Sequence, residues 1–404
     1  MLQQKSKVKR MKVQCDYTVF ITCYKPNKLF MIQLLKSSFT AMLLLLAFFG
    51  CAQEKNAKLI IGTYTNNGSH GMYSYTFSDD ASSVVLDSLQ MINPSYLAVA
   101  KDKQIIYAVN ENNPGAVAAI SINKINGKLI LINTQTTTGA NPCYISVTNN
   151  GKHVYVANYS SGSLQGFATN ANGALGLVQQ TIIDTGSSIN KARQEKPHVH
   201  AAVLSKDNRF LYTTDLGTDE LYIYSLNAKS GMLSPAKKQP VVKLTAGAGP
   251  RHIAFHPATN AAYVIEELSG TVAVFKVNTG NGMLKMQQRI STLPMDFKGV
   301  IGSADIHVSP NGKFLYASNR GSSNSIAIFS IQPKTGKLVY IAEQSTLGKT
   351  PRNFSIHPTG KFLLAANQSS DEIVIFKIDE NTGLLSDTGK RINVKRPVCL
   401  KWLN

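Results

Sequence analysis

The sequence predicts an all-β protein, a seven-bladed β-propeller, and three observations lead to that prediction. A pattern of strand, turn, strand ending in Tyr-x-x-Asn, polar loop, strand and Gly-x-Leu recurs about every 46–55 residues, the spacing of four-stranded propeller blades. Apolar and polar residues alternate within the strand segments, and no segment has a sustained helical period. Finally, half of a repeat unit stands at each end of the repeating region, and the two halves complement each other.

Six complete units follow one another along the chain. They begin at Pro94-Ser95-Tyr96, Pro142-Cys143-Tyr144, near Pro197-His198, at Pro250-Arg251-His252, Ser303-Ala304-Asp305 and Pro351-Arg352-Asn353. Each has room for a four-stranded meander, in which the start of the first strand and the loop after the second strand lie on the same face. The turn between the first two strands, often Asn-Gly-Lys, then lies on the opposite face.

The seventh unit is divided between the two ends of the repeating region. Residues 58–77 read as a second and a third strand without a first, whereas residues 396–403 read as a first strand with nothing after it. Joining the two completes a seventh blade and removes the open sheet edges that a ring must eliminate. We therefore expect one propeller domain over residues 58–404, closed by its C-terminal strand.

The segment before the repeats is typical of a bacterial lipoprotein signal. Lys36 precedes the apolar run of residues 41–50, which is too short to span a bilayer, and Cys51 follows it directly. We expect lipidation at Cys51, with residues 1–51 as extension and signal and residues 52–57 as a short tether. Phe48 departs from the usual pattern of such signals, so an ordinary signal peptide or an uncleaved anchor is the alternative.

This signal predicts export and a lipid anchor in the membrane, facing the periplasm or the cell surface. If the signal is not used, the alternative location is the cytoplasm. Met31 is a more usual start for such a signal than Met1, so residues 1–30 are left out of the fold prediction.

The formal net charge of +19 does not point to nucleic acid. Residues 1–51 contain eight basic residues and one acidic residue, which leaves +12 for the remainder, and those charges are scattered through turns. No basic helix and no aromatic RNA-binding motif accompanies them. We expect a solvated basic surface on a monomer that binds no nucleic acid, a surface compatible with attraction of an anionic substrate.

Several kinds of catalytic site have no motif in the sequence. There is no Cys/His cluster with metal-ligand spacing, no Gly-x-Ser-x-Gly nucleophile elbow and no phosphate-binding P-loop. We expect no metal and no cofactor. Cys143 and Cys399 lie in apolar strand patterns two repeat units apart, and we interpret them as buried free thiols rather than a disulfide.

Comparison of the repeats separates architecture from candidate chemistry, because residues shared by most blades are structural. His256 and His357 precede proline in the far-face turns and are interpreted as turn residues. The position at the start of the first strand holds, in turn, Ser95, Cys143, His200, Arg251, Ala304, Arg352 and Val398. The position after the second strand holds Glu111, Tyr159, Leu216, Glu267, Arg320 and Gln368. The candidates that come from three consecutive blades are His200, Arg251, Glu267 and Arg320.

These four side chains suit the opening of an ester in an acidic substrate. His200 or Glu267 is the candidate base toward water. Arg251 is the candidate donor to the developing oxyanion, and Arg320 the candidate holder of a phosphate or carboxylate. The long segment before the third unit, residues 187–196, adds Arg193 as a candidate for anion binding. A structural ion pair between Arg251 and Glu267 is the alternative interpretation.

Longer stretches of the sequence resemble the propeller lactonase family. These are Lys196-Pro-His-Val-His-Ala-Ala-Val, Asp215-Leu-Gly-Thr-Asp-Glu-Leu-Tyr, Gly249-Pro-Arg-His, Tyr263-Val-Ile-Glu-Glu-Leu-Ser, Ser303-Ala-Asp-Ile-His-Val-Ser-Pro and Tyr316-Ala-Ser-Asn-Arg-Gly. That family includes a 6-phosphogluconolactonase and is similar to a carboxymuconate-lactonizing enzyme. The resemblance implies a metal-independent lactone hydrolase or lactonizing enzyme. It also implies site roles for a histidine, two arginines and a glutamate, at His200, Arg251, Arg320 and Glu267, with His198 as a nearby substrate-binding candidate.

The expected reaction is therefore hydrolysis of an anionic sugar lactone, 6-phosphogluconolactone to 6-phosphogluconate. Two alternatives stay open, namely a lactonase for another, extracytoplasmic sugar lactone and a non-catalytic ligand-binding propeller. The signal at Cys51 motivates the first of these, because 6-phosphogluconolactone is a cytoplasmic metabolite.

Overall fold

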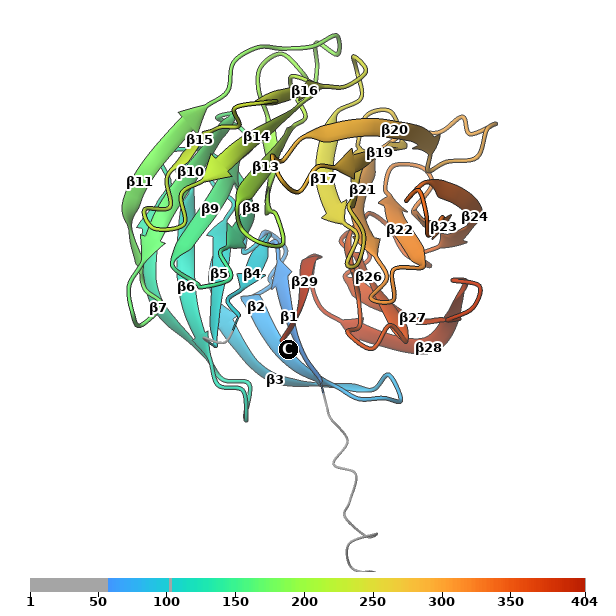
Figure 1. Ribbon diagram of the computed structural model, residues 1–404. Coiled ribbons are helices and arrows are strands. Elements are labelled where there is room, and N and C mark those ends of the chain that lie inside the picture. The colour runs from blue at the N-terminus through green and yellow to red at the C-terminus, as the bar shows by residue number, and fades with distance from the viewer. Residues whose placement is uncertain (1–56, 102–103, 404) are drawn as a thin grey trace, which may run out of the picture. The chain divides into compact units, whose positions relative to one another are not determined.

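A computed structural model describes residues 57–101 and 104–403, which all belong to the compact unit Lys55–Asn404. These residues form seven antiparallel sheets and no helix, and the sheets stand as blades around a central axis (Figure 1). The predicted all-β, seven-bladed propeller is confirmed. The predicted signal, Cys51 and residues 52–56 of the predicted tether lie outside the described residues. Within the described ranges, no helix is long and apolar enough to cross a membrane.

The first three blades follow the predicted repeat units, with one irregular outer edge. Blade 1 contains β4 (Leu97–Val99), β5 (Ile105–Asn110), β6 (Ala116–Ile122) and β7 (Leu129–Thr136); blade 2 contains β8 (Pro142–Val147), β9 (His153–Asn158), β10 (Ser163–Thr169) and β11 (Leu175–Ile183); blade 3 contains β12 (Val199–Leu204), β13 (Phe210–Asp215), β14 (Glu220–Leu226), β15 (Leu233–Pro235) and β16 (Val241–Lys243). Both β15 and β16 pair with β14. The fourth strand of this blade is thus broken in two around Pro240, which has no backbone N–H to donate.

The remaining blades include the one that joins both ends of the repeat region. Blade 4 contains β17 (Pro250–Phe255), β18 (Ala261–Glu266), β19 (Thr271–Val277) and β20 (Leu284–Ser291); blade 5 contains β21 (Ser303–Val308), β22 (Phe314–Asn319), β23 (Ser325–Ile331) and β24 (Leu338–Ser345); blade 6 contains β25 (Pro351–Ile356), β26 (Phe362–Asn367), β27 (Glu372–Ile378) and β28 (Leu385–Asn393); blade 7 contains β29 (Pro397–Leu403), β1 (Ala57–Thr63), β2 (Gly71–Phe77) and β3 (Ser83–Gln90). Strand β1 begins one residue before the predicted domain.

Blade 7 closes the ring as predicted. Its strand order is β29-β1-β2-β3, and β29 pairs antiparallel with β1, with Leu59 opposite Trp402 and Ile61 opposite Leu400. In Figure 1 the red β29 lies beside the blue β1. The pairing covers the sheet edge that β1 would otherwise expose.

The recurring tyrosine and glycine of the sequence repeat tie neighbouring blades together. The tyrosine of a second strand donates its hydroxyl to the carbonyl of the glycine in the Gly-x-Leu turn of the next blade. The pairs are Tyr107 with Gly173, Tyr155 with Gly231, Tyr212 with Gly282, Tyr263 with Gly336 and Tyr316 with Gly383. All five glycines have positive φ, a conformation that costs glycine little.

The hydrophobic core lies between successive blades rather than along the axis. Side chains from the two facing sheets interdigitate, as where Tyr212 and Ile223 of blade 3 meet Val264 and Phe275 of blade 4. The innermost strands (β4, β8, β12, β17, β21, β25 and β29) contact their neighbours around the axis. Because blade packing supplies the apolar core, the axis is free to hold polar side chains.

Candidate active site

The side chains that gather at one end of the axis come mainly from the two repeat positions that the sequence comparison singled out. They enclose a cavity of about 230 Å³. Its lining residues are Tyr64, Glu111, Cys143, Tyr159, Arg193, His200, Glu267, Arg320 and Arg352. Of the four predicted catalytic residues, three line this cavity, and the fourth, Arg251, lies beneath it.

Local β-bulges aim the inner-strand residues at the axis. The pairing between the first two strands shifts register at Cys143, His200, Arg251 and Arg352. A bulge leaves one residue out of the ladder and turns its side chain away from the regular alternation. In three of the four blades a proline begins the strand directly before the bulge, so the Pro-x pairs of the sequence mark these positions.

Glu267 is the hub of the predicted cluster. It follows β18 directly, and its side chain is only 5% exposed. Its Oε1 atom accepts a hydrogen bond from Nη2 of Arg193 at 2.7 Å, and its Oε2 atom lies 2.9 Å from Nη2 of Arg320 and 3.0 Å from Nε of Arg251. Three guanidinium groups from three parts of the chain therefore share one buried carboxylate.

These charges keep Glu267 ionised. Burial raises the pKa of this carboxyl group, but the positive charges of Arg320, Arg251 and Arg193 outweigh burial and hold the pKa at about 2. A carboxylate with so low a pKa is a weak proton acceptor at neutral pH. This favours an electrostatic role for Glu267 over the role of general base.

Arg251 lies under the cavity floor and does not line it. It is 1% exposed, and its Nη1 atom donates to the carbonyl oxygen of Ala304 at 2.6 Å. Its Nε atom pairs with Glu267 by charge, without an aligned hydrogen bond. Burial and the charges of two other arginines lower its pKa to about 10, so it is a cation at neutral pH. The expected direct contact of Arg251 with an oxyanion has no support in this placement.

His200 offers an open ring nitrogen. His200 is 4% exposed, and the Nδ1 atom of its ring lies 3.9 Å from Sγ of Cys143. No described residue hydrogen-bonds its Nε2 atom. Burial, followed by the charge of Arg251, holds the pKa of His200 well below 6.5, so the ring is neutral at neutral pH. A neutral imidazole with an open nitrogen in a cavity is a candidate proton acceptor.

The segment before blade 3 brings Arg193 to the rim of the cavity. The side chain of Arg193 is 42% exposed and also donates to the hydroxyl of Tyr159 at 3.3 Å. Gln194 fixes the segment from below, because its buried amide donates to the carbonyl of Leu216. Arg193 is thus held over the cavity next to solvent.

His198 occupies a layer behind the cavity. Its ring stacks on Tyr159 with centroids 4.4 Å apart, and its Nδ1 atom lies 3.1 Å from the carbonyl oxygen of the same tyrosine. Its Nε2 atom lies 3.2 Å from Glu195. The structure therefore places His198 against Tyr159 and not among the lining residues, and substrate binding by His198 stays a prediction.

The opposite wall of the cavity was not predicted from the sequence. The Tyr64 hydroxyl donates to Oε2 of Glu111 at 2.8 Å, and the guanidinium of Arg352 lies over the Tyr64 ring, 5.4 Å from its centroid. Arg352 approaches Glu111 only to 3.9 Å. In the described part of the chain, no group accepts a hydrogen bond from its guanidinium, so these donors face the cavity uncommitted.

Cys143 and Cys399 are buried free thiols, as predicted. Although Cys143 lines the cavity, burial raises the pKa of its thiol far above neutral. The thiol is then protonated at neutral pH and is a poor nucleophile. Within residues 57–101 and 104–403, no three His, Cys, Asp or Glu side chains are placed to hold a metal ion.

The sequence profile of a family described as lactonase, 7-bladed β-propeller, matches residues 58–402. The chain belongs to this lactonase family. The predicted family resemblance is confirmed, and with it the expectation of a lactone-hydrolysing, ester-cleaving enzyme at the level of the family.

Individual relatives of this lactonase agree with the family assignment. A 6-phosphogluconolactonase of Bacillus subtilis is 36% identical over 347 residues, which cover 85% of this chain and 97% of the relative. A 6-phosphogluconolactonase of Formosa agariphila is 36% identical over 334 residues, or 81% and 94% of the two chains. The solved structure of a periplasmic gluconolactonase from Pseudomonas aeruginosa has a TM-score of 0.82 at 33% identity and covers 86% of this chain and 99% of its own.

The mouth of this lactonase carries an excess of positive charge. Four arginines lie in or directly beneath the cavity, and two glutamates oppose them. The arginines are Arg193, Arg251, Arg320 and Arg352, and the glutamates are Glu111 and Glu267. Three of the four arginines share Glu267, which leaves Arg352 as the cation with the most free hydrogen-bonding capacity.

The cavity residues of this lactonase that were not predicted stand at recognisable positions of the sequence repeat. Cys143, Tyr159, Glu111 and Arg352 occupy the same two repeat positions as the predicted residues, but only three consecutive blades were chosen. Tyr64 follows β1, the second strand of blade 7, and so fills the repeat position that the divided blade left vacant in the comparison.

Proposed function

We propose that the protein hydrolyses a sugar lactone that carries an anionic substituent, with 6-phosphogluconolactone as the substrate. One observation supports this proposal most directly. A neutral imidazole with an open nitrogen, that of His200, lines the same cavity as three guanidinium groups. Ester hydrolysis needs a proton acceptor for water and positive charge for the developing oxyanion, and this cavity supplies both.

In the proposed reaction, Nε2 of His200 takes a proton from a water molecule as the water oxygen bonds to the lactone carbonyl carbon. The carbonyl electron pair moves onto its oxygen, and the N–H groups of Arg193 and Arg320 stabilise that oxyanion. When the tetrahedral intermediate collapses, the bond between the carbonyl carbon and the ring oxygen breaks. The departing alkoxide takes the proton from His200, which returns to its neutral form with the open-chain acid as product.

His200 is preferred over Glu267 as the base for an electrostatic reason. The carboxylate of Glu267 pairs with three guanidinium groups, and its pKa of about 2 leaves it little affinity for a proton. Its task in the proposal is to hold Arg193 and Arg320 in place. If the protein turns over no lactone, the second candidate function is binding of an anionic ligand in this cavity without catalysis.

Arg352 is the proposed holder of the anionic substituent. Its guanidinium lies beside Tyr64 and Glu111, and the N–H groups of the guanidinium donate no hydrogen bond to any described residue. A guanidinium presents paired donors that match the oxygens of a phosphate or carboxylate. The anionic substituent of the substrate is thus proposed to bind at one wall of the cavity and the ester group at the opposite wall.

Substitution of Arg352 should therefore separate charged from uncharged lactones. We expect Arg352→Met to raise KM for 6-phosphogluconolactone by about 10-fold or more, since one charge-assisted hydrogen bond is worth roughly 1.5–3 kcal/mol. KM for unphosphorylated gluconolactone should change less than about 2-fold. Initial rates with both lactones measure this, with Arg391→Met on the outer strand β28 as control. Equal effects on both lactones would refute the proposed role.

A panel of lactones tests the function itself. Turnover of 6-phosphogluconolactone with a higher kcat/KM than unphosphorylated sugar lactones supports the proposal. A preference for an unphosphorylated lactone would favour the alternative of an extracytoplasmic sugar lactonase, which the Pseudomonas aeruginosa periplasmic gluconolactonase and the signal at Cys51 both motivate. No turnover of any lactone, with a ligand still protecting the cavity residues from modification, would favour a binding propeller.

We further propose that the protein is a monomer exported and anchored through a lipid on Cys51, without affinity for nucleic acid. Cys51→Ala is expected to abolish labelling by a radioactive fatty acid and to move the protein out of the membrane fraction. The parent protein should carry the label and sediment with membranes. Equal labelling of both proteins would exclude Cys51 as the lipid site.

A further inference from the structure

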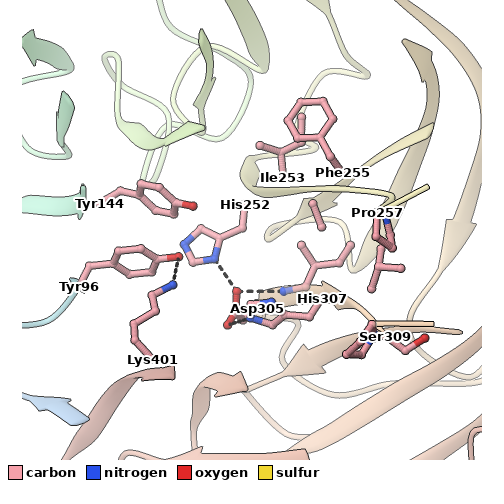
Figure 2. A pocket seen from close by; sticks show the side chains of 14 residues that line it. Tyr96, Tyr144, His252, Ile253, Phe255, Pro257, Asp305, His307, Ser309 and Lys401 are labelled. Carbon is pink, nitrogen blue, oxygen red and sulfur yellow. Dashed lines mark hydrogen bonds and ion pairs between the residues drawn. The ribbon is translucent and has the colours of Figure 1, made fainter. Parts of the chain in front are cut away.

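A second polar cluster lies on the axis beneath the proposed reaction cavity and takes no part in the proposed chemistry. Its centre is Asp305 in β21, which is 1% exposed. One carboxylate oxygen lies 2.7 Å from Nδ1 of His252 and the other 2.9 Å from Nε2 of His307 (Figure 2). The same carboxylate also accepts from the side chain of Asn353 and from the backbone N–H groups of Ile306 and Phe354.

The surroundings of His252 select one tautomer of its ring. Its Nδ1 atom faces a carboxylate, which is acceptor-only, so Nδ1 carries the proton and donates it. Its Nε2 atom lies 3.3 Å from Nη1 of Arg251, and a guanidinium has no acceptor, so Nε2 is unprotonated and accepts. Burial and the charge of Arg251 hold the pKa of His252 at about 4, in agreement with a neutral ring.

Asp305 is held in the acceptor state that this arrangement needs. Burial opposes its ionisation, but the charge of His307 and the hydrogen bonds from His252 and His307 outweigh burial and keep its pKa well below the usual value. The ring of His252 is further confined edge-on by Tyr96 and Tyr144, with centroids 5.6 Å and 5.4 Å away. Figure 2 shows these two tyrosines stacked beside the imidazole.

The cluster reaches the cavity through Arg251. The guanidinium of this residue is fixed by His252 and by the Ala304 carbonyl at Nη1, and by the charge of Glu267 at Nε. A chain of buried contacts therefore runs from Asp305 through His252 and Arg251 to the carboxylate that organises the cavity. None of the first three residues of this chain lines the cavity itself.

We propose that Asp305 and His252 are positioning residues, which orient the guanidinium of Arg251 and, through it, the carboxylate of Glu267. The proposal rests on the proposed function in that lactone turnover reports on the placement of Glu267. Its physical basis is directional: the acceptor at Nε2 of His252 points at Arg251 only while Asp305 holds the proton of that ring on Nδ1.

Two substitutions of His252 separate orientation from mere packing. In His252→Gln the side-chain oxygen can accept from Arg251 while the amide donates to Asp305, whereas His252→Leu can do neither. We expect His252→Leu to lower kcat by about 10–100-fold, the usual range for loss of a residue that orients a site from behind, with KM changed less than about 3-fold. His252→Gln should retain kcat within about 5-fold of the parent.

A double-substitution cycle tests whether His252 acts through Arg251. In an Arg251→Met background, adding His252→Leu should lower kcat by less than about 2-fold, because the residue to be oriented is absent. His357→Gln, at a far-face turn outside this cluster where the histidine contacts Thr359, is the control and should keep kcat within about 2-fold. Equal losses from His252→Leu in both backgrounds, or loss of thermal stability with unchanged kcat, would overturn the proposal.

Nitrogen NMR of histidine-labelled protein gives a readout that needs no turnover. The signals of His252, assigned by their absence in His252→Gln, should show a neutral ring protonated at Nδ1 at pH 7, and Asp305→Asn should shift them. A ring protonated at Nε2, or a charged ring, overturns the inference. If the parent hydrolyses no lactone, the proposed function fails while this measurement still decides the orientation.

Discussion

Replacing His200 with asparagine is expected to lower kcat for lactone hydrolysis by about 10²–10⁴-fold, the usual contribution of a positioned acid–base group. The fold should be intact, because asparagine is smaller than histidine, and the His200 ring makes only a long contact to Cys143 and edge-on contacts to Tyr159 and His252. KM should change little, since substrate charge is proposed to be bound by arginines. Steady-state kinetics with circular dichroism and thermal unfolding measure both expectations.

The pH dependence of the parent enzyme gives the second part of this test. The neutral ring of His200 is the active form, and burial with the charge of Arg251 places its pKa below 6.5. The value of kcat/KM should thus rise with pH in the acid range and be level around pH 7. His256→Asn, at a far-face turn where the histidine accepts two backbone N–H groups, is the control and should match the parent. If kcat of His200→Asn equals that of the parent, His200 is not the general base and another group takes the proton.

Replacing Glu267 with glutamine is expected to destabilise the fold as well as to abolish most activity. Glutamine has the same size, but it leaves three guanidinium groups at one buried point without their shared counter-charge. Loss of one partner of a buried ion pair typically costs about 3–5 kcal/mol. The free energy of unfolding in denaturant at pH 7 measures this. A change below about 1 kcal/mol would show that the carboxylate is dispensable to the cluster.

Acid should remove the same contribution from the parent protein. The pKa of Glu267 is lowered in the folded state from 4.5 to about 2, so its contribution to stability is present above pH 4.5 and is lost as the pH falls toward 2. That shift corresponds to about 3 kcal/mol. The difference in unfolding free energy between parent and Glu267→Gln should shrink over this range. Parallel curves for the two proteins would contradict the assignment, since Asp305 titrates equally in both.

The repeat made most of the fold predictable, because each blade served as a control for the others. The closure of blade 7 followed from complementary halves at residues 58–77 and 396–403. The interruption between β15 and β16 did not, because a strand broken around Pro240 still reads as one polar-apolar stretch. The register of the strands could not be predicted, because the bulges at His200 and Arg251 depend on how each strand pairs with the next one.

The site was predicted in position but not in depth. His200 and Arg251 occupy the same repeat position, yet one lines the cavity and the other lies under it, because Glu267 and the Ala304 carbonyl draw the longer side chain inward. Arg352 was passed over because only candidates from three consecutive blades were chosen, and it belongs to blade 6. Its partners, Glu111 and Tyr64, reach it only across the closed ring.

The pairing of β29 with β1 also sets an order of events during synthesis. Tyr64 stands at the start of the propeller and Arg352 near its end, so a nascent chain on the ribosome has neither a closed ring nor both walls of the cavity. The last strand to be made is the one that locks the first, and contacts so distant in sequence form slowly. The ring, and with it the complete cavity, can therefore close only after β29 has been synthesised.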